Sequence, residues 1–165
     1  MSLDNIHALA RAVIIEQGHL LLAYDPREKP EHYYKLNAFF YYLPGGHIEF
    51  KESAQSALLR EIEEETGYKG HYERFLGILE NAWSFSNDEI CCHTHEINFL
   101  FKVTIPGLMP AITIPQREEH VAFKWWPLTE LDWAELMPEA LKTLLPEWLD
   151  LSLSKAFASS ITPAK

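Results

Sequence analysis

The sequence predicts a single α/β domain in which a mixed β-sheet is packed between helices. Extended apolar segments lie on both sides of one long helical segment, residues 53–66, and a second helical stripe follows at residues 138–145. No internal repeat or linker divides the 165 residues, which are enough to bury a sizeable core. We expect one domain over residues 1–165, with a core at about 8–146 and a flexible tail at 154–165.

Composition and charge exclude several classes of protein. Hydrophobic residues make up 47% of the chain and aromatic residues 13%, which is typical of a globular protein. The 24 acidic and 14 basic residues give a net charge of −10. Such an excess of negative charge argues against broad electrostatic binding to nucleic acid or to an anionic membrane, so we expect neither as a partner.

The chain also lacks targeting patterns. Its start does not resemble a signal peptide, and no apolar run approaches the roughly 20 residues of a membrane-spanning helix. The only cysteines, Cys91 and Cys92, are adjacent, a spacing poorly suited to a stabilising disulfide. These features favour the reducing cytoplasm.

The N-terminal segment predicts a β-hairpin. Residues 8–15 and 19–24 are largely β-branched or aliphatic, and Gln17-Gly18 supplies a turn between them. Arg11 interrupts the first of these strands. Its side chain could reach a phosphate in a central cleft or lie in solvent at the strand edge, and the sequence leaves both open.

Residues 25–40 predict a surface loop, followed by a short strand that ends at Leu43-Pro44. The loop contains two prolines, mixed charge and clustered aromatic residues. These aromatic side chains could stack on a nucleobase or pack the loop onto the core, and we favour packing. They are Tyr33, Tyr34, Phe39 and Phe40.

A glycine turn then leads into the long helix. Gly45 and Gly46 allow the backbone to approach a ligand closely, because glycine lacks a Cβ and tolerates unusual dihedral angles. We expect the helix to begin near Glu52 or Ser53, where an acid or hydroxyl suits the N-terminus, and to end at Gly67.

The last turns of this helix are acidic on the face that should point inward. At about 100° per residue, Glu61, Glu64 and Glu65 lie on the same side as the apolar residues of the first turns, whereas Glu63 points away. Carboxylates that face the protein need a compensating cation, and a divalent metal ion is the simplest candidate. Arg60 precedes Glu64 by four residues, so it could orient that carboxylate or form an ordinary surface pair.

The spacing of this stretch resembles the signature of the Nudix hydrolases. That signature is Gly, five residues, Glu, seven residues, Arg-Glu, an apolar residue, any residue, Glu-Glu, any residue, Gly and an apolar residue. The matching positions here are Gly46, Glu52, Arg60, Glu61, Ile62, Glu64, Glu65, Gly67 and Tyr68. Only Tyr68 departs mildly, because an aliphatic residue is more usual there. The resemblance implies an α/β/α sandwich with a mixed sheet.

The resemblance also implies a chemistry. Members of the family hydrolyse a nucleoside diphosphate linked to another group X with Mg²⁺, for which Mn²⁺ can substitute. It implies metal ligands at Glu61, Glu64, Glu65 and the Gly46 carbonyl, and catalytic roles for Arg60, Glu61, Glu64 and Glu119. Substrate-binding positions are Arg11, Tyr41 and Glu52. Tyr41 lies two residues before the leucine of the glycine turn, and Glu119 lies six residues before Trp125, in a segment like the late strand of the family. The resemblance leaves Glu61 and Glu119 as the two candidates for the general base.

The remaining segments complete the sheet and the second helix layer. Residues 71–83 and 95–103 read as strands, 104–116 as a connection, and 138–145 as a helix after which Pro146 opens another short helix. A cluster between the two strands could bind zinc, but it lacks the paired spacing of structural zinc sites, so buried cysteines beside strand histidines are favoured. The cluster is Cys91, Cys92, His93 and His95.

The residues after the signature bear on the substrate. Markers of the ADP-ribose and dinucleoside-polyphosphate members are missing after the signature, where Trp83, Ser84 and Phe85 stand. We expect a nucleoside triphosphate or a related small nucleotide, with ADP-ribose or a nucleoside-diphosphate sugar as the alternative. A non-catalytic nucleotide sensor is an alternative of another class, disfavoured because every signature acid is present. Many relatives pair, so a homodimer is a further expectation from the resemblance.

Overall fold

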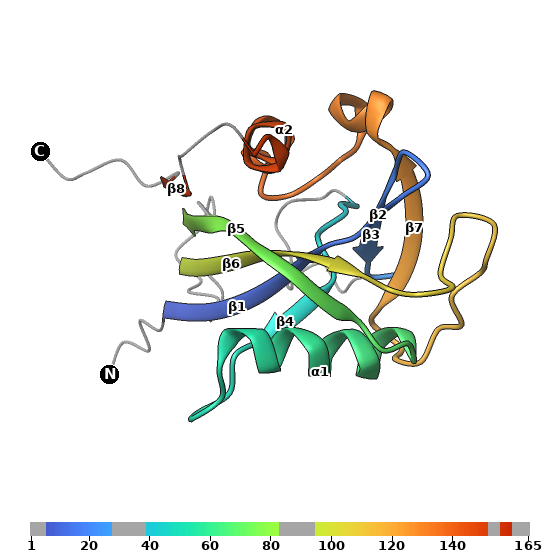
Figure 1. Ribbon diagram of the computed structural model, residues 1–165, viewed down its shortest axis with the longest axis horizontal. Helices are drawn as coiled ribbons and strands as arrows, with labels where there is room; N and C mark the ends of the chain where they lie inside the picture. Colours follow the sequence, from blue (N-terminus) through green and yellow to red (C-terminus); the bar gives the residue numbers. More distant parts are fainter. Residues whose placement is uncertain (1–5, 28–38, 83–94, 152–155, 160–165) are drawn as a thin grey trace, which may run out of the picture.

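The structure is a computed structural model that describes residues 6–27, 39–82, 95–151 and 156–159 (Figure 1). Its main feature is a five-stranded mixed sheet with the strand order β4-β1-β6-β5-β8. The strands are β1 (Ile6–Val13), β4 (Gly45–His47), β5 (His71–Ala82), β6 (His95–Thr104) and β8 (Phe157–Ser159). β1 pairs in parallel with β6 and antiparallel with β4, while β5 pairs antiparallel with β6 and in parallel with β8.

A second sheet of three strands has the order β2-β3-β7. It consists of β2 (Ile15–Glu16), β3 (His19–Tyr24) and β7 (Ala122–Pro127). The predicted hairpin is therefore wrong over residues 8–13, since only β2 pairs with β3. β1 has β4 on one side and β6 on the other, so it has no open edge for β3, and the chain changes sheets at Ile14.

Helix α1 (Ala54–Thr66) forms as predicted, because local chemistry fixes both of its ends. The Ser53 hydroxyl accepts a hydrogen bond from the Ser56 N–H at 3.1 Å, which satisfies one of the free donors of the first turn. Gly67 adopts the left-handed conformation with φ of 76° and donates its N–H to the Glu63 carbonyl. The helix buries Ala57, Leu58 and Ile62 against one face of the large sheet.

The opposite face of the large sheet packs against α2 (Leu141–Leu149), with the 3₁₀ helix η1 (Leu128–Trp133) nearby. Figure 1 shows the two α-helices on opposite sides of this sheet, which confirms the predicted layered fold. Pro146 lies inside α2 and does not open a new helix. Burial of Leu145 and Trp148 on its two sides compensates for the hydrogen bond that proline cannot donate.

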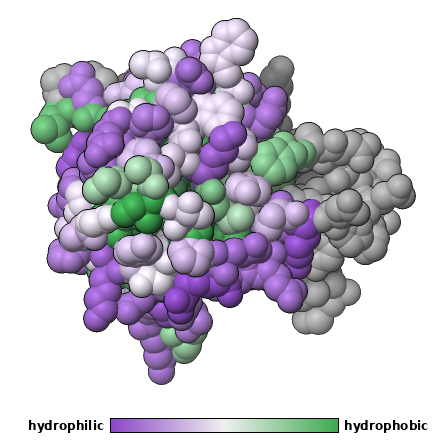
Figure 2. Space-filling model, turned by 90° about the vertical axis from the view of Figure 1, so that its right-hand side faces the viewer, coloured by the Kyte–Doolittle hydropathy of each residue, from purple (hydrophilic) through white to green (hydrophobic). Residues whose placement is uncertain are grey.

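Two further segments complete the core. The connection between β6 and β7 buries Ile105 and Leu108 in the hydrophobic cluster on the α1 side of the large sheet. On the surface, hydrophobic residues on the β7 side of the molecule form a patch bordered by hydrophilic ones (Figure 2). β8 falls within the stretch predicted as a flexible tail, where it pairs with residues Ile78 to Glu80 of β5. Across the residues that the structure describes, no helix is long and apolar enough to cross a membrane.

Gly45 is required where β4 meets β1. Its φ is +116°, and a Cβ at this position would overlap the carbonyl oxygen of Ala10. We expect Gly45→Ala to lower the free energy of unfolding by about 2 kcal/mol or more, measured by urea denaturation. Gly18→Ala is the matched control, because Gly18 also has a positive φ, +73°, but has open space around it. Equal losses in the two variants would show that backbone strain alone, and not the close approach, matters at Gly45.

Candidate active site

A cavity of about 430 Å³ lies at the edge of the large sheet, where the end of α1 passes over β4. Side chains from β1, α1, β6 and the segment before β7 meet on its wall. The polar ones that matter below are Arg11, Glu61, Glu65, Glu96, Asn98 and Glu118. Residues far apart in the sequence thus form one concave, largely acidic site.

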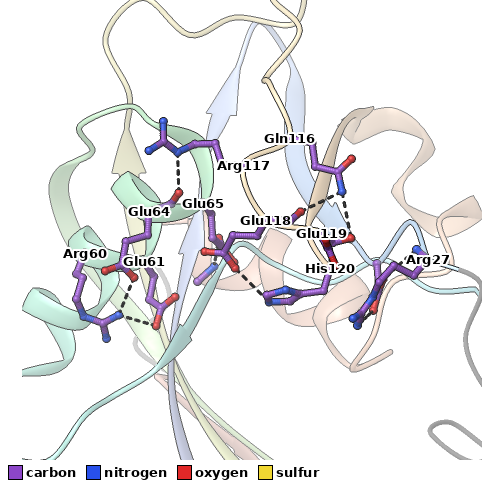
Figure 3. Close-up of polar contacts among 12 residues, drawn as sticks. Arg27, Arg60, Glu61, Glu64, Glu65, Gln116, Arg117, Glu118, Glu119 and His120 are labelled. Carbon is purple, nitrogen blue, oxygen red and sulfur yellow. Dashed lines mark hydrogen bonds and ion pairs between the residues drawn. The ribbon is translucent and has the colours of Figure 1, made fainter.

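Arg60 holds the side chains of two acidic residues of α1 in place by hydrogen bonds. Its Nη1 donates to Glu61 Oε1 at 2.9 Å and to Glu64 Oε2 at 3.1 Å (Figure 3). On its other side Nε and Nη2 hold both carboxylate oxygens of Glu52, at 3.0 and 2.9 Å. The hydrogen bonds with Glu52, and then those with Glu61 and Glu64, raise the pKa of the Arg60 guanidinium above its ordinary value. Glu52 therefore acts on Arg60 and is not on the cavity wall.

Glu61 lies directly against the glycine turn. A Cβ on Gly46 would be 2.6 Å from Glu61 Cδ and 2.7 Å from each of its carboxylate oxygens. Only glycine therefore allows this carboxylate to pack against the backbone at residue 46. The structure thus brings together two of the four positions that the sequence predicts as metal ligands, Gly46 and Glu61.

Glu65 is a buried acid, with 5% of its surface exposed. Its Oε2 accepts a hydrogen bond from the Gly45 N–H at 3.1 Å. Burial raises its pKa to about 8, an effect that the Gly45 N–H and the charge of Arg11 oppose and the charges of Glu61 and Glu118 reinforce. A carboxylate in this position would be stabilised by a nearby cation.

The residues present fit a hard, oxygen-binding metal ion. Within residues 6–27, 39–82, 95–151 and 156–159, no three His, Cys, Asp or Glu side chains lie close enough together to hold a metal ion, and the Glu64 side chain is 53% exposed. Mg²⁺ does not need such a site, because it usually binds one or two carboxylates and keeps several waters for its remaining positions. Glu61 and Glu65 on the cavity wall supply the carboxylate oxygens that such an ion prefers.

The acid that reaches the cavity from the segment before β7 is Glu118. Glu118 lines the cavity and its Oε2 lies 3.2 Å from His120 Nε2. Glu119, the residue chosen from the sequence, is exposed and does not line it; its backbone carbonyl accepts a hydrogen bond from Gln116 Nε2 (Figure 3). Arg117 ties this segment to α1, since its Nε donates to the Glu64 carbonyl at 3.0 Å.

Arg11 reaches the cavity wall, while Tyr41 does not. The Arg11 Nη1 donates to the carbonyls of Leu43 and Gly45, which places its positive charge beside the glycine turn. Tyr41 is 8% exposed and packs in the core against Trp126, whereas the next residue, Tyr42, lines the cavity. The one-residue difference follows from the alternation of side chains along an extended segment.

Some sequence-predicted residues lie elsewhere. His95 is on β6, with its Nε2 3.4 Å from Glu80 Oε1, while its neighbours in the predicted zinc cluster fall outside the described residues. Phe39 packs against Tyr24 and Tyr41, whereas Phe40 lines the cavity. The residues outside the description are Tyr33, Tyr34, Cys91, Cys92 and His93.

The chain is similar to proteins of known family and fold. A family model described as NUDIX domain matches residues 6–148. The MutT protein of Methanosarcina mazei Go1 has a TM-score of 0.65 at 20% identity, covering 92% of this chain and 98% of that one. The ORF135 protein of E. coli has a TM-score of 0.58 at 23% identity, covering 90% and 91%.

A third solved structure, an ADP-ribose pyrophosphatase from Streptococcus suis 89-1591, has a TM-score of 0.59 at 18% identity and covers 93% of this chain and 96% of that one. At these sequence identities, the structural similarity shows a shared fold. The family model, in contrast, spans most of the sequence, including the signature acids and the cavity. The chain therefore belongs to the NUDIX family and is a Nudix hydrolase.

Proposed function

We propose that this protein hydrolyses a phosphoanhydride bond in a nucleoside diphosphate linked to another group, with Mg²⁺ or Mn²⁺ as cofactor. Nucleoside triphosphates or related small nucleotides are the proposed substrates. The observation that supports this most directly is the meeting of Glu61, Glu65 and Glu118 on the wall of one cavity, beside the glycine turn and Arg11.

Each residue of the site has a role in the proposal. Glu61, Glu65 and the Gly46 carbonyl would hold the metal ion at the cavity wall, which when bound neutralises phosphate charge and lowers the pKa of a bound water, and Glu64 would contribute from the edge of the site. Arg60 keeps Glu61 and Glu64 in place. The chain carries a net charge of −10, so Arg11 supplies positive charge where an anionic substrate needs it.

A general base must remove a proton from the attacking water. Of the acids on the cavity wall, Glu61 and Glu118 are the ones that we assign to this role. We assign to Glu118 the role that the sequence assigned to Glu119, because Glu118 lines the cavity and Glu119 is exposed.

Chromatographic detection of the products over a nucleotide panel tests the proposal, because a triphosphate would yield a nucleoside monophosphate and pyrophosphate, and ADP-ribose or a nucleotide sugar would yield a nucleoside monophosphate and a phosphorylated sugar. The panel contains ribo- and deoxynucleoside triphosphates, ADP-ribose and nucleoside-diphosphate sugars, each with Mg²⁺ and with EDTA. Mg²⁺-dependent cleavage of triphosphates supports the proposal. Faster cleavage of ADP-ribose or a nucleotide sugar would move the substrate to the alternative class, and binding without hydrolysis of any compound would favour a sensor and overturn the proposal.

The neighbouring acids before β7 offer a matched pair of variants. We expect Glu118→Gln to lower turnover by about tenfold or more, because it removes a charge from the cavity wall without changing its shape. Glu119→Gln removes a charge that is one residue away but exposed, so its turnover should stay near wild type. Steady-state kinetics on the best substrate of the panel measure both. The reverse order of losses would return the role to Glu119.

A further inference from the structure

The cavity has a second polar wall that the hydrolytic roles do not use. Glu96 and Asn98 on β6 both line it, and they are only 7% and 3% exposed. Their side chains lie on the same side of the strand as Leu100, a fully buried core residue. A buried carboxylate and a buried amide are unfavourable unless something satisfies their hydrogen bonds.

The protein itself satisfies them only in part. Arg11 Nε donates to Asn98 Oδ1 and Asn98 Nδ2 donates to the Leu79 carbonyl, both at 3.5 Å, a long distance for a hydrogen bond. Among the residues that the structure describes, no hydrogen-bond donor contacts the Glu96 carboxylate. Both of its oxygens are therefore available to a ligand in the cavity.

The strand register places this pair about one nucleoside away from the metal-binding acids. Gly46 pairs with Ala10, which pairs with Phe99. Glu96 is three residues further along β6, which at roughly 3.3 Å per residue is about 10 Å from the level of Gly46. A nucleotide with its phosphates at Gly46 would place its ribose near the Arg11 side chain and its base near Asn98 and Glu96.

The same part of the cavity offers aromatic surface. Phe40 and Tyr42 both line it, with ring centroids 6.2 Å apart. Aromatic side chains stack on any nucleobase, so they bind the base without selecting it. Selection must come from hydrogen bonds to the edge of the base, and Glu96 and Asn98 are the buried polar groups positioned to make them.

We propose that Glu96 and Asn98 determine the base specificity of the enzyme, and that the preferred base is guanine. The inference rests on the proposed function, in that a nucleotide occupies the cavity. An ionised carboxylate can only accept hydrogen bonds, and guanine presents two adjacent donors, N1–H and the 2-amino group, that match its two oxygens. The neighbouring O6 of guanine accepts from the second amide hydrogen of Asn98.

Other bases fit this wall less well. Adenine and cytosine each present one amino donor beside an acceptor nitrogen, and uracil presents one N–H between two carbonyl oxygens. An acceptor placed against the Glu96 carboxylate is repelled, which makes these bases weaker ligands.

The kinetic test compares GTP with ATP in wild type, Glu96→Gln and a control. A glutamine offers one acceptor and one donor, which matches adenine better than guanine. We expect Glu96→Gln to reduce the ratio of kcat/KM for GTP to that for ATP by about tenfold or more, mainly through KM. Glu80→Gln is the control: Glu80 pairs with Ile97, whose side chain is on the other side of β6 from Glu96. It should keep the wild-type ratio.

Binding of the nucleoside monophosphates without metal provides a second measurement, by calorimetry. GMP and dGMP should bind wild type equally and more tightly than AMP, and Glu96→Gln should lose this preference. A loss of affinity for dGMP alone would show that Glu96 contacts the ribose, and an unchanged base preference in Glu96→Gln would also overturn the inference. A guanine preference in binding without hydrolysis of any nucleotide would leave the inference standing and the proposed function refuted.

Discussion

Glu61→Gln is expected to lower Mg²⁺-dependent turnover by at least about a hundredfold without unfolding the protein. The substitution removes the charge of a carboxylate that packs against Gly46 on the cavity wall, but it keeps the volume of the side chain. Arg60 retains its hydrogen bonds to Glu52, so the neighbouring helix turn should stay in place. Steady-state kinetics measure the loss, and thermal denaturation checks that the variant is folded.

Glu63→Gln is the control for this experiment. Glu63 lies on the same helix two residues away, but its side chain is exposed and points away from the cavity. Its loss changes the net charge by the same amount, so turnover should remain near wild type. If both variants lost turnover to a similar extent, the total negative charge of the helix, and not the position of Glu61, would be responsible for the loss.

The helix and its acids were predictable because the information is local. A serine cap, a glycine terminator and a periodic apolar face fix the ends and orientation of α1 from its own residues. The inward direction of Glu61 and Glu65 follows from the same periodicity, and both line the cavity. The remaining signature acid, Glu64, is at the edge of that face and is half exposed, held by Arg60.

The pairing of strands was less predictable because it depends on distant segments. Residues 8–15 have the apolar pattern of a hairpin strand, yet β1 instead pairs in parallel with β6, about ninety residues later. Likewise, Pro146 reads as a helix start by itself. Burial of Leu145 and Trp148 against the sheet keeps it inside α2.

Two of the site residues that sequence reasoning missed lie next to the residues that were chosen. Tyr42 and Glu118 line the cavity where the adjacent Tyr41 and Glu119 were chosen. Glu96 and Asn98 form a polar face of β6, which in a sequence reads as a solvent-facing one. The structure shows instead that both side chains are buried and that they line the wall of the cavity.

Without metal, the protein should lose stability as the pH rises through the pKa of Glu65, which burial raises from an ordinary value of 4.5 to about 8. The folded state favours the neutral acid, so the stabilisation is complete below about pH 4.5 and is lost as the pH rises through 8. The loss in free energy of unfolding is at most about 5 kcal/mol, since one pKa unit corresponds to about 1.4 kcal/mol. Urea denaturation in EDTA between pH 5 and 9 measures it.

Glu65→Gln removes the titrating group but keeps its shape, so its stability should be nearly independent of pH over this range. Glu63→Gln, which alters an exposed acid on the same helix, should follow the wild-type curve. Mg²⁺ added at high pH should restore much of the lost stability to wild type and less to Glu65→Gln, because a cation that binds the folded state compensates the buried charge. If the free energy of unfolding depended on pH in the same way for wild type and Glu65→Gln, the titration of Glu65 would not be the cause of the pH dependence.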